Sequence, residues 1–472
     1  MFMNYKELGF KAGIEIHQQL EGKKLFCDDF TEIRKEKPDF KITRVLRASA
    51  GESGGVDKAA AYEQQKSKVF EYLGYKDINC LVETDDEPPH DVNLDALNSA
   101  FIMAKLLNMK VPDKIQFMRK VVIDGSNTSG FQRTALIGVD GFIEVNGKKF
   151  GVESLCLEEE ACQVIKRGKE KDTYNLSRLG IPLLEIATAP DMKTAEECKE
   201  VAGAIGKLIR SLSNAKRGIG SIRQDVNVSI KGGVRVEIKG FQDYKNIPKV
   251  IDFEINRQLS LIKKKEKLVS HVRKAEPDFS TSYLRPMPGA DRMYPETDVE
   301  VIVPDLRNIK IPETISEAEK RYKKEFELND DQSKNAVKHD FKNDFELEKL
   351  FKKYSSNNLK PAQIFEVYLY KIPEFMKKEN VNDVDFDEIL KNLSEGKVTI
   401  QSLQNIIKDY KSGKVDFTKY EVLSDKKLEE IISKIVSKNK NAPRGALMGM
   451  IMKEIQGKAE GSKVMQILNK KL

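Results

Sequence analysis

Apolar and polar residues alternate almost without interruption from Ile222 to Lys239, and this pattern constrains the fold more than any other part of the chain. Alternate residues of a β-strand point to opposite faces of its sheet, so the pattern predicts two strands that share one apolar face. Gly232 and Gly233 lie between them and supply the positive φ angles of a tight turn. The other face is either solvated or suited to binding phosphates together with a metal. Its residues are Arg223, Asp225, Asn227, Ser229, Arg235, Glu237 and Lys239.

A shorter alternation places Glu15 and His17 on one face of another predicted strand, with Ile14 and Ile16 on the opposite face. A carboxylate and an imidazole held side by side can bind a divalent cation or act as an acid–base pair. The same pattern also fits the solvated edge of an amphipathic strand.

A predicted hairpin ends in a run of three carboxylates. Residues 142–145 lead into Asn146-Gly147, which is typical of a type I′ turn, and a return strand follows from Lys149. Glu158, Glu159 and Glu160 come directly after that strand. The run is either the solvated start of a helix or a group at the mouth of a sheet, and its spacing does not distinguish Glu158 from Glu159.

Glu185 lies inside the apolar segment 181–187. An ionised carboxylate in such surroundings needs a cationic partner or a metal ion. Arg178 is a candidate partner, so a structural salt bridge and a functional site are equally good interpretations of Glu185.

Composition indicates a globular protein of several domains. The chain has 472 residues, of which 40% are hydrophobic and 33% charged, and this length is typical of about three domains. We find no apolar run of the ~20 residues that span a bilayer and no signal peptide pattern, so a cytoplasmic protein is expected. The five cysteines form no C-x-x-C pair, and reduced thiols without a disulfide framework or zinc site are therefore predicted.

The predicted fold class is α+β. Residues 1–304 are expected to form a mixed β-sheet domain, residues 305–396 an all-helical domain, and residues 397–472 a small helical tail. Residues 401–472 hold 15 lysines and arginines against 8 acidic residues. A basic module of this kind suits a nucleic-acid backbone, although a lysine-rich helix bundle has the same composition.

Five ordered segments together resemble one family. They are GIEIHQQL at 13–20, ETDDEPPH at 83–90, RKVVIDGSNTSGFQRT at 119–134, PLLEI at 182–186 and RPMPGADRMYPETD at 285–298. The chain resembles the GatB/GatE family of glutamyl-tRNA(Gln) amidotransferases, in which GatE is the archaeal form and GatB the bacterial form. Several long motifs in order are far more specific than one short pattern. The residues at 18–19 and 126–130 favour the GatE form over the GatB form.

The resemblance implies a large catalytic cradle, a helical domain and a tail that binds tRNA. It also implies the amidation of glutamyl-tRNA(Gln): ATP, with Mg²⁺, phosphorylates the γ-carboxylate of tRNA-bound glutamate, and ammonia then displaces the phosphate. Nothing in the sequence resembles an amidase, so the resemblance implies that a glutaminase partner, GatD, supplies the ammonia.

The residues predicted to perform this reaction come from the motifs and from the predicted hairpin. His17, Glu158 and Glu185 are predicted metal ligands with Glu15 beside them, and Glu159 is the alternative to Glu158. Phosphate-binding residues are expected on the polar face of the hairpin, namely Arg223, Arg235 and Lys239. Glu237 and Asp225 are weaker candidates for a second metal or for holding these cations.

Two absences also bear on function. Residues 125–130 have the glycine spacing of a P-loop, but Phe131 and Gln132 replace its Lys and Ser/Thr, so ATP must bind differently. GatE proteins usually carry an inserted domain, similar to one in bacterial aspartyl-tRNA synthetases, just before the position of Arg285, and none is present here. A GatB-like protein working with GatA and GatC partners therefore stays open, as does a tRNA-binding homologue without catalysis.

Overall fold

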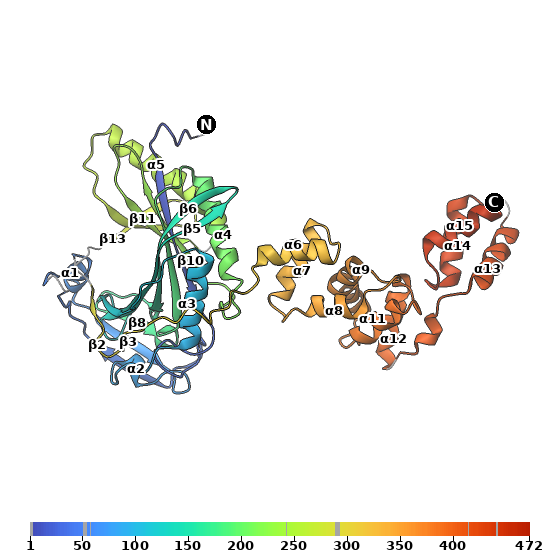
Figure 1. Cartoon of the computed structure of the whole chain (residues 1–472), viewed down its shortest axis with the longest axis horizontal. Helices are drawn as coiled ribbons and strands as arrows, with labels where there is room; N and C mark the ends of the chain where they lie inside the picture. Colours follow the sequence, from blue (N-terminus) through green and yellow to red (C-terminus); the bar gives the residue numbers. More distant parts are fainter. Residues whose placement is uncertain are drawn as a thin grey trace. The chain divides into compact units, whose positions relative to one another are not determined.

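The computed structural model describes residues 3–50, 54–56, 58–241, 243–287, 293–413, 415–439 and 442–472. Its contacts divide the chain into two compact units, Met1–Glu313 and Thr314–Leu472. The first unit contains two β-sheets with helices, and the second is helical (Figure 1). The predicted α+β class is thus confirmed, whereas the assignment of three functional segments stays a prediction.

A ten-stranded mixed sheet forms the centre of the first unit, in the order β13-β12-β11-β10-β1-β9-β6-β5-β4-β14. Neighbouring strands are antiparallel except for the parallel pair β11–β12. Its strands are β1 (Lys11–Gln19), β4 (Phe117–Val121), β5 (Phe131–Val145), β6 (Lys148–Glu159), β9 (Pro182–Thr188), β10 (Ile222–Ser229), β11 (Val236–Phe241), β12 (His271–Ala275), β13 (Thr281–Pro286) and β14 (Met293–Pro295).

The two edge strands of this sheet, β13 and β14, follow one another in the chain with only residues 287–292 between them. Such a connection spans at most about 25 Å. Ten flat strands would separate the edges by about 43 Å. The sheet must therefore curl, and this curvature encloses one of its faces.

Three helices cover the opposite, apolar face: α3 (Leu94–Leu106), α4 (Ala195–Ile209) and α5 (Ile247–Lys263) (Figure 1). The core between sheet and helices contains Ile14 and Ile16 of β1 and Val226 and Val228 of β10, all at most 1% exposed. The apolar positions predicted from the alternation of β1 and β10 are therefore those that the sheet buries.

The two hairpins differ in their turns. Asn146 and Gly147 both have positive φ angles (51° and 76°), as the predicted type I′ turn requires. In the second hairpin Gly232 has a positive φ (76°) within a tight turn, which the Gly233 amide closes by donating to the Ile230 carbonyl at 3.0 Å, whereas the positive φ predicted at Gly233 is wrong. The strands end at Ser229 and begin again at Val236, so the connection is longer than this turn. Beyond this turn, the Val234 amide donates a hydrogen bond to the side chain of Gln258 on α5 at 3.1 Å.

A four-stranded sheet lies beside the large one within the first unit, in the order β2-β3-β8-β7. Its strands are β2 (Phe40–Arg44), β3 (Val69–Gly74), β7 (Gln163–Lys166) and β8 (Lys171–Asn175), and the short helices α1 (Lys58–Gln64) and α2 (Leu81–Thr84) accompany it. Tyr72 and Tyr174 stack in its core with ring centroids 5.7 Å apart.

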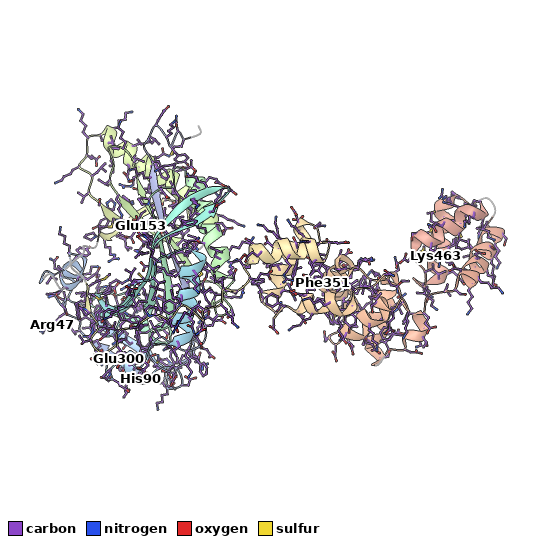
Figure 2. The ribbon with its side chains drawn as sticks, viewed as in Figure 1. Arg47, His90, Glu153, Glu300, Phe351 and Lys463 are labelled. Atoms are coloured by element: carbon purple, nitrogen blue, oxygen red, sulfur yellow. The ribbon has the colours of Figure 1, made fainter. Side chains whose placement is uncertain are left out.

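The second unit holds two hydrophobic cores. Phe351 lies in the larger core, which spans residues 318–420, and Lys463 lies on α15 beside the smaller core of residues 428–468 (Figure 2). Its helices are α6 (Ile315–Glu325), α7 (Asp330–Asp340), α8 (Glu346–Tyr354), α9 (Pro361–Glu366), α10 (Ile372–Glu379), α11 (Phe386–Ser394), α12 (Leu403–Asp409), α13 (Asp425–Lys438), α14 (Arg444–Ile455) and α15 (Gly461–Lys471). Among the described residues, no helix combines the length and apolar character needed to cross a membrane.

Candidate active site

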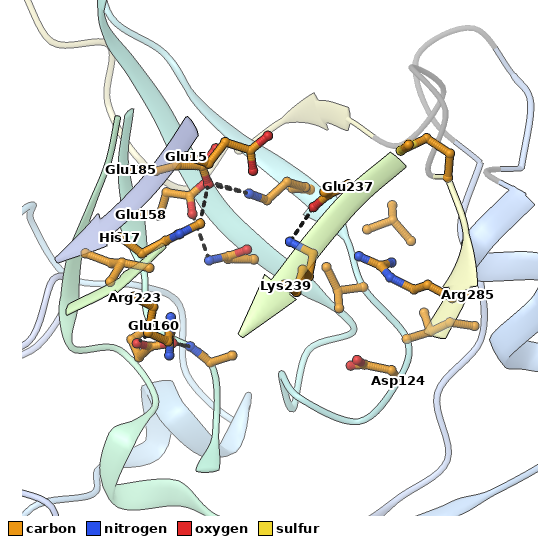
Figure 3. A pocket seen from close by; sticks show the side chains of 18 of the residues that line it. Glu15, His17, Asp124, Glu158, Glu160, Glu185, Arg223, Glu237, Lys239 and Arg285 are labelled. Atoms are coloured by element: carbon orange, nitrogen blue, oxygen red, sulfur yellow. Dashed lines mark hydrogen bonds and ion pairs between the residues drawn. The ribbon is translucent and has the colours of Figure 1, made fainter. Parts of the chain in front are cut away.

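A polar cavity of about 390 Å³ lies on the face of the ten-stranded sheet that the helices leave uncovered (Figure 3). Seven predicted site residues line it: Glu15, His17, Glu158, Glu185, Arg223, Arg235 and Lys239. Of the two weaker candidates, Glu237 also lines it, whereas Asp225 is not among its described lining residues. The cavity is also lined by Lys120, Asp124, Gln132, Glu160, Glu237 and Arg285, among others. The alternation of the strands thus brings the polar faces of β1, β10 and β11 together in one place.

His17 lies in the centre of a row of residues on three adjacent strands. It is the cross-strand partner of Glu185 on β9 and of Arg223 on β10. Its Nε2 atom lies 3.3 Å from Glu185 Oε2. Burial by itself lowers the pKa of His17, but the hydrogen bond and charge of Glu185 outweigh it, so the pKa is raised above 6.5.

Glu15 lies two residues before His17 on the same face of β1. Potential ligand atoms of Glu15, His17 and Glu185 all lie within 4.8 Å of one another. Asn227 donates a hydrogen bond to Glu15 Oε1 at 2.9 Å. Burial, with the nearby charge of Glu237, raises the pKa of Glu15. Two carboxylates and an imidazole at this spacing are a suitable donor set for a divalent cation.

Glu158 and Glu159 point to opposite faces of β6, so that Glu158 but not Glu159 lies in the cavity, and the choice of metal ligand between them stays a prediction. Glu158 lines the cavity, where Lys120, Gln132 and Thr134 donate hydrogen bonds to its carboxylate at 2.5–3.1 Å. Glu159 faces away from the cavity and forms an ion pair with Arg133 at 3.4 Å.

Lys120 on β4 joins the carboxylates of Glu158 and Glu185, at 2.5 and 3.8 Å from its Nζ atom. Burial and the charge of Glu185 raise the pKa of Glu158. Burial also opposes ionisation of Glu185, but Lys120 and His17 outweigh it and hold the pKa of Glu185 well below 4.5. Glu158 and Glu185 therefore share the positive charge of Lys120.

Arg223 pairs with the buried carboxylate of Glu160 at 2.9 Å, and Gln19 donates a second hydrogen bond to that carboxylate at 2.9 Å. Burial alone would raise the pKa of Glu160, but the charges of Arg223 and Arg178 and these hydrogen bonds lower it to about 2. An ionised Glu160 thus fixes the guanidinium of Arg223 beside the cavity.

The remaining predicted cations lie along β11 and just before it. Lys239 pairs with Asp225 at 2.7 Å and with Glu237 at 2.5 Å, as expected for carboxylates that hold a cation in place. Arg235 donates from Nε to Asn227 at 3.0 Å. A second triad of potential ligands, Glu15, Asp225 and Glu237, lies within 4.8 Å in the same region.

One predicted interaction is wrong. Arg178 does not pair with Glu185, because its guanidinium donates to the backbone carbonyls of Ala161 and Cys162 instead. His17 and Lys120 are the partners of Glu185. Lys120 was not predicted, although a lysine followed by the apolar residues 121–123 carries the same signal that identified Glu185.

Two of the five cysteines, Cys27 and Cys80, lie close together, which their spacing in the sequence does not indicate. Cys27, Asp29, Cys80 and Glu83 place potential ligand atoms within 4.8 Å of one another, outside the cavity. The thiols remain free, as predicted. Lys24 lies 2.6 Å from Glu83 Oε1, so this carboxylate already has a buried cationic partner.

Comparison with known proteins identifies the first unit. Residues 10–310 match the model of the GatB/GatE catalytic domain. The chain is 35% identical to the E-type subunit of glutamyl-tRNA(Gln) amidotransferase from Methanococcus maripaludis, with 100% of this chain and 99% of that protein covered. The proteins of the same name from Methanocaldococcus jannaschii and Archaeoglobus fulgidus are each 34% identical, with 100% of this chain and 100% and 99% of those proteins covered.

The relatives are longer than this chain. The alignment with the M. maripaludis protein extends over 630 positions, 158 more than the 472 residues here, so the difference consists of gaps. Within the described residues 243–287, α5 leads through a short loop into β12 and β13, and no further domain intervenes. The chain therefore belongs to the GatB/GatE family of amidotransferase subunits and lacks an inserted domain before Arg285.

Proposed function

We propose that the chain is the subunit that amidates glutamyl-tRNA(Gln) in two steps. In the first step, an oxygen of the glutamate γ-carboxylate bonds to the γ-phosphorus of ATP, and ADP leaves. In the second step, ammonia bonds to the acyl carbon, inorganic phosphate leaves, and a proton is released. The product is glutaminyl-tRNA(Gln).

The observation that carries this proposal is the convergence of carboxylates, an imidazole and cations from several strands in one cavity. Glu15, His17 and Glu185 present the closest set of donor atoms, and this set fits a divalent cation. Glu158 stays a candidate ligand, because its carboxylate lines the same cavity and shares Lys120 with Glu185. Bound Mg²⁺ would supply positive charge to the phosphates and to the phosphoryl group in transfer.

The chain's own cations have matching roles in the proposal. Arg223, Arg235 and Lys239 lie along one wall of the cavity and would bind phosphate oxygens. Glu160 and Asp225 hold two of these cations in fixed positions, so little reorganisation is needed when negative charge develops. Lys120 would keep the carboxylate of Glu185 ionised, and would pair with Glu158, until the cation binds.

Ammonia in this proposal comes from a partner, a glutaminase of the GatD type, and the basic segment 401–472 contributes to tRNA binding. The proposed location is the cytoplasm, where aminoacyl-tRNA is used. The absence of an inserted domain favours one alternative, a GatB-like protein working with GatA and GatC partners. Supplying glutamine with GatD or with GatA and GatC, and measuring which addition restores amidation, distinguishes the two.

The decisive test is formation of glutaminyl-tRNA from glutamyl-tRNA(Gln), ATP, Mg²⁺ and free ammonium. We expect product from the wild type, and a loss of at least 100-fold in His17→Ala and Glu185→Ala with unchanged tRNA binding. His90→Ala is the matched control, because His90 lies at the surface away from the cavity and pairs with Glu87 at 3.0 Å (Figure 2). Normal tRNA binding without any product would favour a non-catalytic homologue.

A further inference from the structure

Arg285 is the first residue of the family motif at 285–298, which supplies none of the predicted metal or phosphate ligands. Its side chain reaches into the cavity from β13, an edge strand of the curled sheet (Figure 3). Within the part of the chain that the structure describes, Arg285 has no ion pair or side-chain hydrogen bond. Three other cations of the cavity, Lys120, Arg223 and Lys239, each pair with a carboxylate.

A β-bulge determines the direction in which Arg285 points. Arg273 of β12 is opposite Tyr283, but its neighbour Val272 is opposite Arg285, so Leu284 is an extra residue on β13. Cross-strand partners lie on the same face of a sheet. Val272 in turn is paired with Glu237, which lines the cavity. The bulge therefore places Arg285 on the cavity face, whereas a regular register would turn it towards α5.

The face of the same two strands that lies towards α5 is fixed by a buried carboxylate. Glu254 of α5 is fully buried; it accepts a hydrogen bond from Thr281 of β13 at 3.0 Å and lies 3.5 Å from the guanidinium of Arg273 on β12. Arg257 completes its ion pairs at 2.7 Å. Breaking such a buried network leaves an uncompensated charge, so Glu254 holds β12 and β13 firmly against α5.

We propose that Arg285 binds a phosphate group of the nucleoside triphosphate, and that Glu254 is a positioning residue that sets its place through β12 and β13. This inference rests on the proposed function, because it assigns a ligand to the same cavity. A guanidinium matches the paired oxygens of a phosphate, and Arg285 can bind them without giving up an existing ion pair. The bulge supplies the geometry, since bulges commonly redirect side chains next to active sites.

The first test is binding of ATP with Mg²⁺ to the full chain, measured by calorimetry. We expect Arg285→Gln to raise the Kd at least 10-fold, and Arg285→Lys to raise it less. Arg307→Gln is the matched control, because Arg307 is exposed and pairs only with Asp305 among the described residues. An unchanged Kd in Arg285→Gln would overturn this inference and leave the proposed function standing. A wild type that binds no ATP would overturn both this inference and the nucleotide step of the proposed function.

The second test is a double-mutant cycle on the same binding measurement. If Glu254 acts through Arg285, Glu254→Gln should raise the Kd about 3- to 10-fold in the wild type and leave it unchanged in the Arg285→Gln background. Equal effects in both backgrounds would overturn the positioning role. If Glu254→Gln fails to fold, Thr281→Val removes one hydrogen bond to Glu254 and replaces it in the cycle. Loss of glutamyl-tRNA binding with normal ATP binding in Arg285→Gln would assign Arg285 to the other substrate and overturn the phosphate assignment.

Discussion

His17 Nε2 and Glu185 Oε2 lie 3.3 Å apart on adjacent strands, although β1 and β9 are far apart in the sequence. The Glu185 carboxylate orients the His17 imidazole, and the imidazole helps to keep the buried carboxylate ionised. Without His17 and Lys120, the ionised carboxylate of Glu185 would be costly at this depth.

Glu158→Gln and Glu159→Gln should have different effects, because the two side chains lie on opposite faces of β6. Glu158→Gln should lower amidation at least 100-fold, since Glu158 lines the cavity, and its activity is compared at matched stability because the change also weakens the ion pair of the buried Lys120. Glu159→Gln should mainly lower the free energy of unfolding, by about 2–4 kcal/mol, because it leaves the buried Arg133 short of a partner. Urea unfolding and the ammonium-dependent assay measure the two effects. Equal losses of activity at equal stability would contradict this division.

Gly125, the first glycine of the P-loop-like spacing at 125–130, occupies a position that excludes a larger residue for structural reasons. Its φ is +85°, and an added Cβ would lie 2.2 Å from the Phe70 ring. Gly125→Ala should therefore destabilise the first unit by more than about 2 kcal/mol, measured by urea unfolding. Gly130→Ala is the matched control: its φ is +80°, but the nearest atom to an added Cβ is 3.8 Å away, so only about 1 kcal/mol of backbone strain is expected. Equal losses in the two variants would show that contact with Phe70 is unimportant.

The helical unit should have an acid-sensitive ion pair at Glu348. Burial opposes ionisation of Glu348, but hydrogen bonds from Arg321 and Lys352, at 2.7 and 2.5 Å, lower its pKa from 4.5 to about 2. Because the folded-state pKa is the lower one, the ionised group stabilises the fold above pH 4.5, and this contribution is lost as the pH falls towards 2. Glu348→Gln should cost roughly 1–2 kcal/mol at pH 7 and nothing near pH 2, measured by urea unfolding across this range.

Glu374→Gln serves as the control for that measurement. Glu374 is exposed on α10 and has no ion pair among the described residues, so its stability difference should stay near zero at every pH. A Glu348→Gln difference that does not change between pH 7 and pH 2 would show that ionisation of Glu348 does not contribute.

The basic tail should bind tRNA through non-specific phosphate contacts. Lys453, Lys470 and Lys471 are exposed on α14 and α15. Their joint replacement by Gln should weaken tRNA binding and reduce the slope of log Kd against log salt by up to about 3, because each phosphate contact releases about one counterion. Filter binding at several salt concentrations measures this slope. The same replacement at Lys263, Lys264 and Lys265, a lysine run at the end of α5, should leave the slope unchanged. An unchanged slope in the tail variant would remove the tail from the tRNA interface.

The sequence alone predicts which side chains share a face, and the structure confirms this for Glu15 and His17 on β1 and for Arg223 on β10. Strand alternation is a local property with a period of two residues, so it can be recognised in the sequence without knowing the neighbouring strands. The family resemblance assigned roles to Glu158 and Glu185, which local patterns left ambiguous, although only Glu185 lies in one of the five motifs.

Other features depend on contacts between distant segments and could not be predicted. The sequence does not show that β1 lies between β9 and β10, that Lys120 lies between two carboxylates, or that Cys27 meets Cys80. The loop after Ser229 contacts Gln258 of α5 through the Val234 amide, and no local pattern indicates this contact. The bulge at Leu284 likewise follows from pairing with β12, since the sequence of β13 by itself specifies no register.

The order of the strands in the large sheet has a consequence for synthesis and folding. The first cavity residue, Glu15, is made near the start of translation, but its pocket also needs Arg285 and the strands between them. Strand pairings across such long sequence separations form slowly, because loop closure must precede the contacts that stabilise it. A nascent chain that ends before β13 leaves the edge of β12 unpaired, and we therefore expect truncated products to aggregate more readily than the full chain.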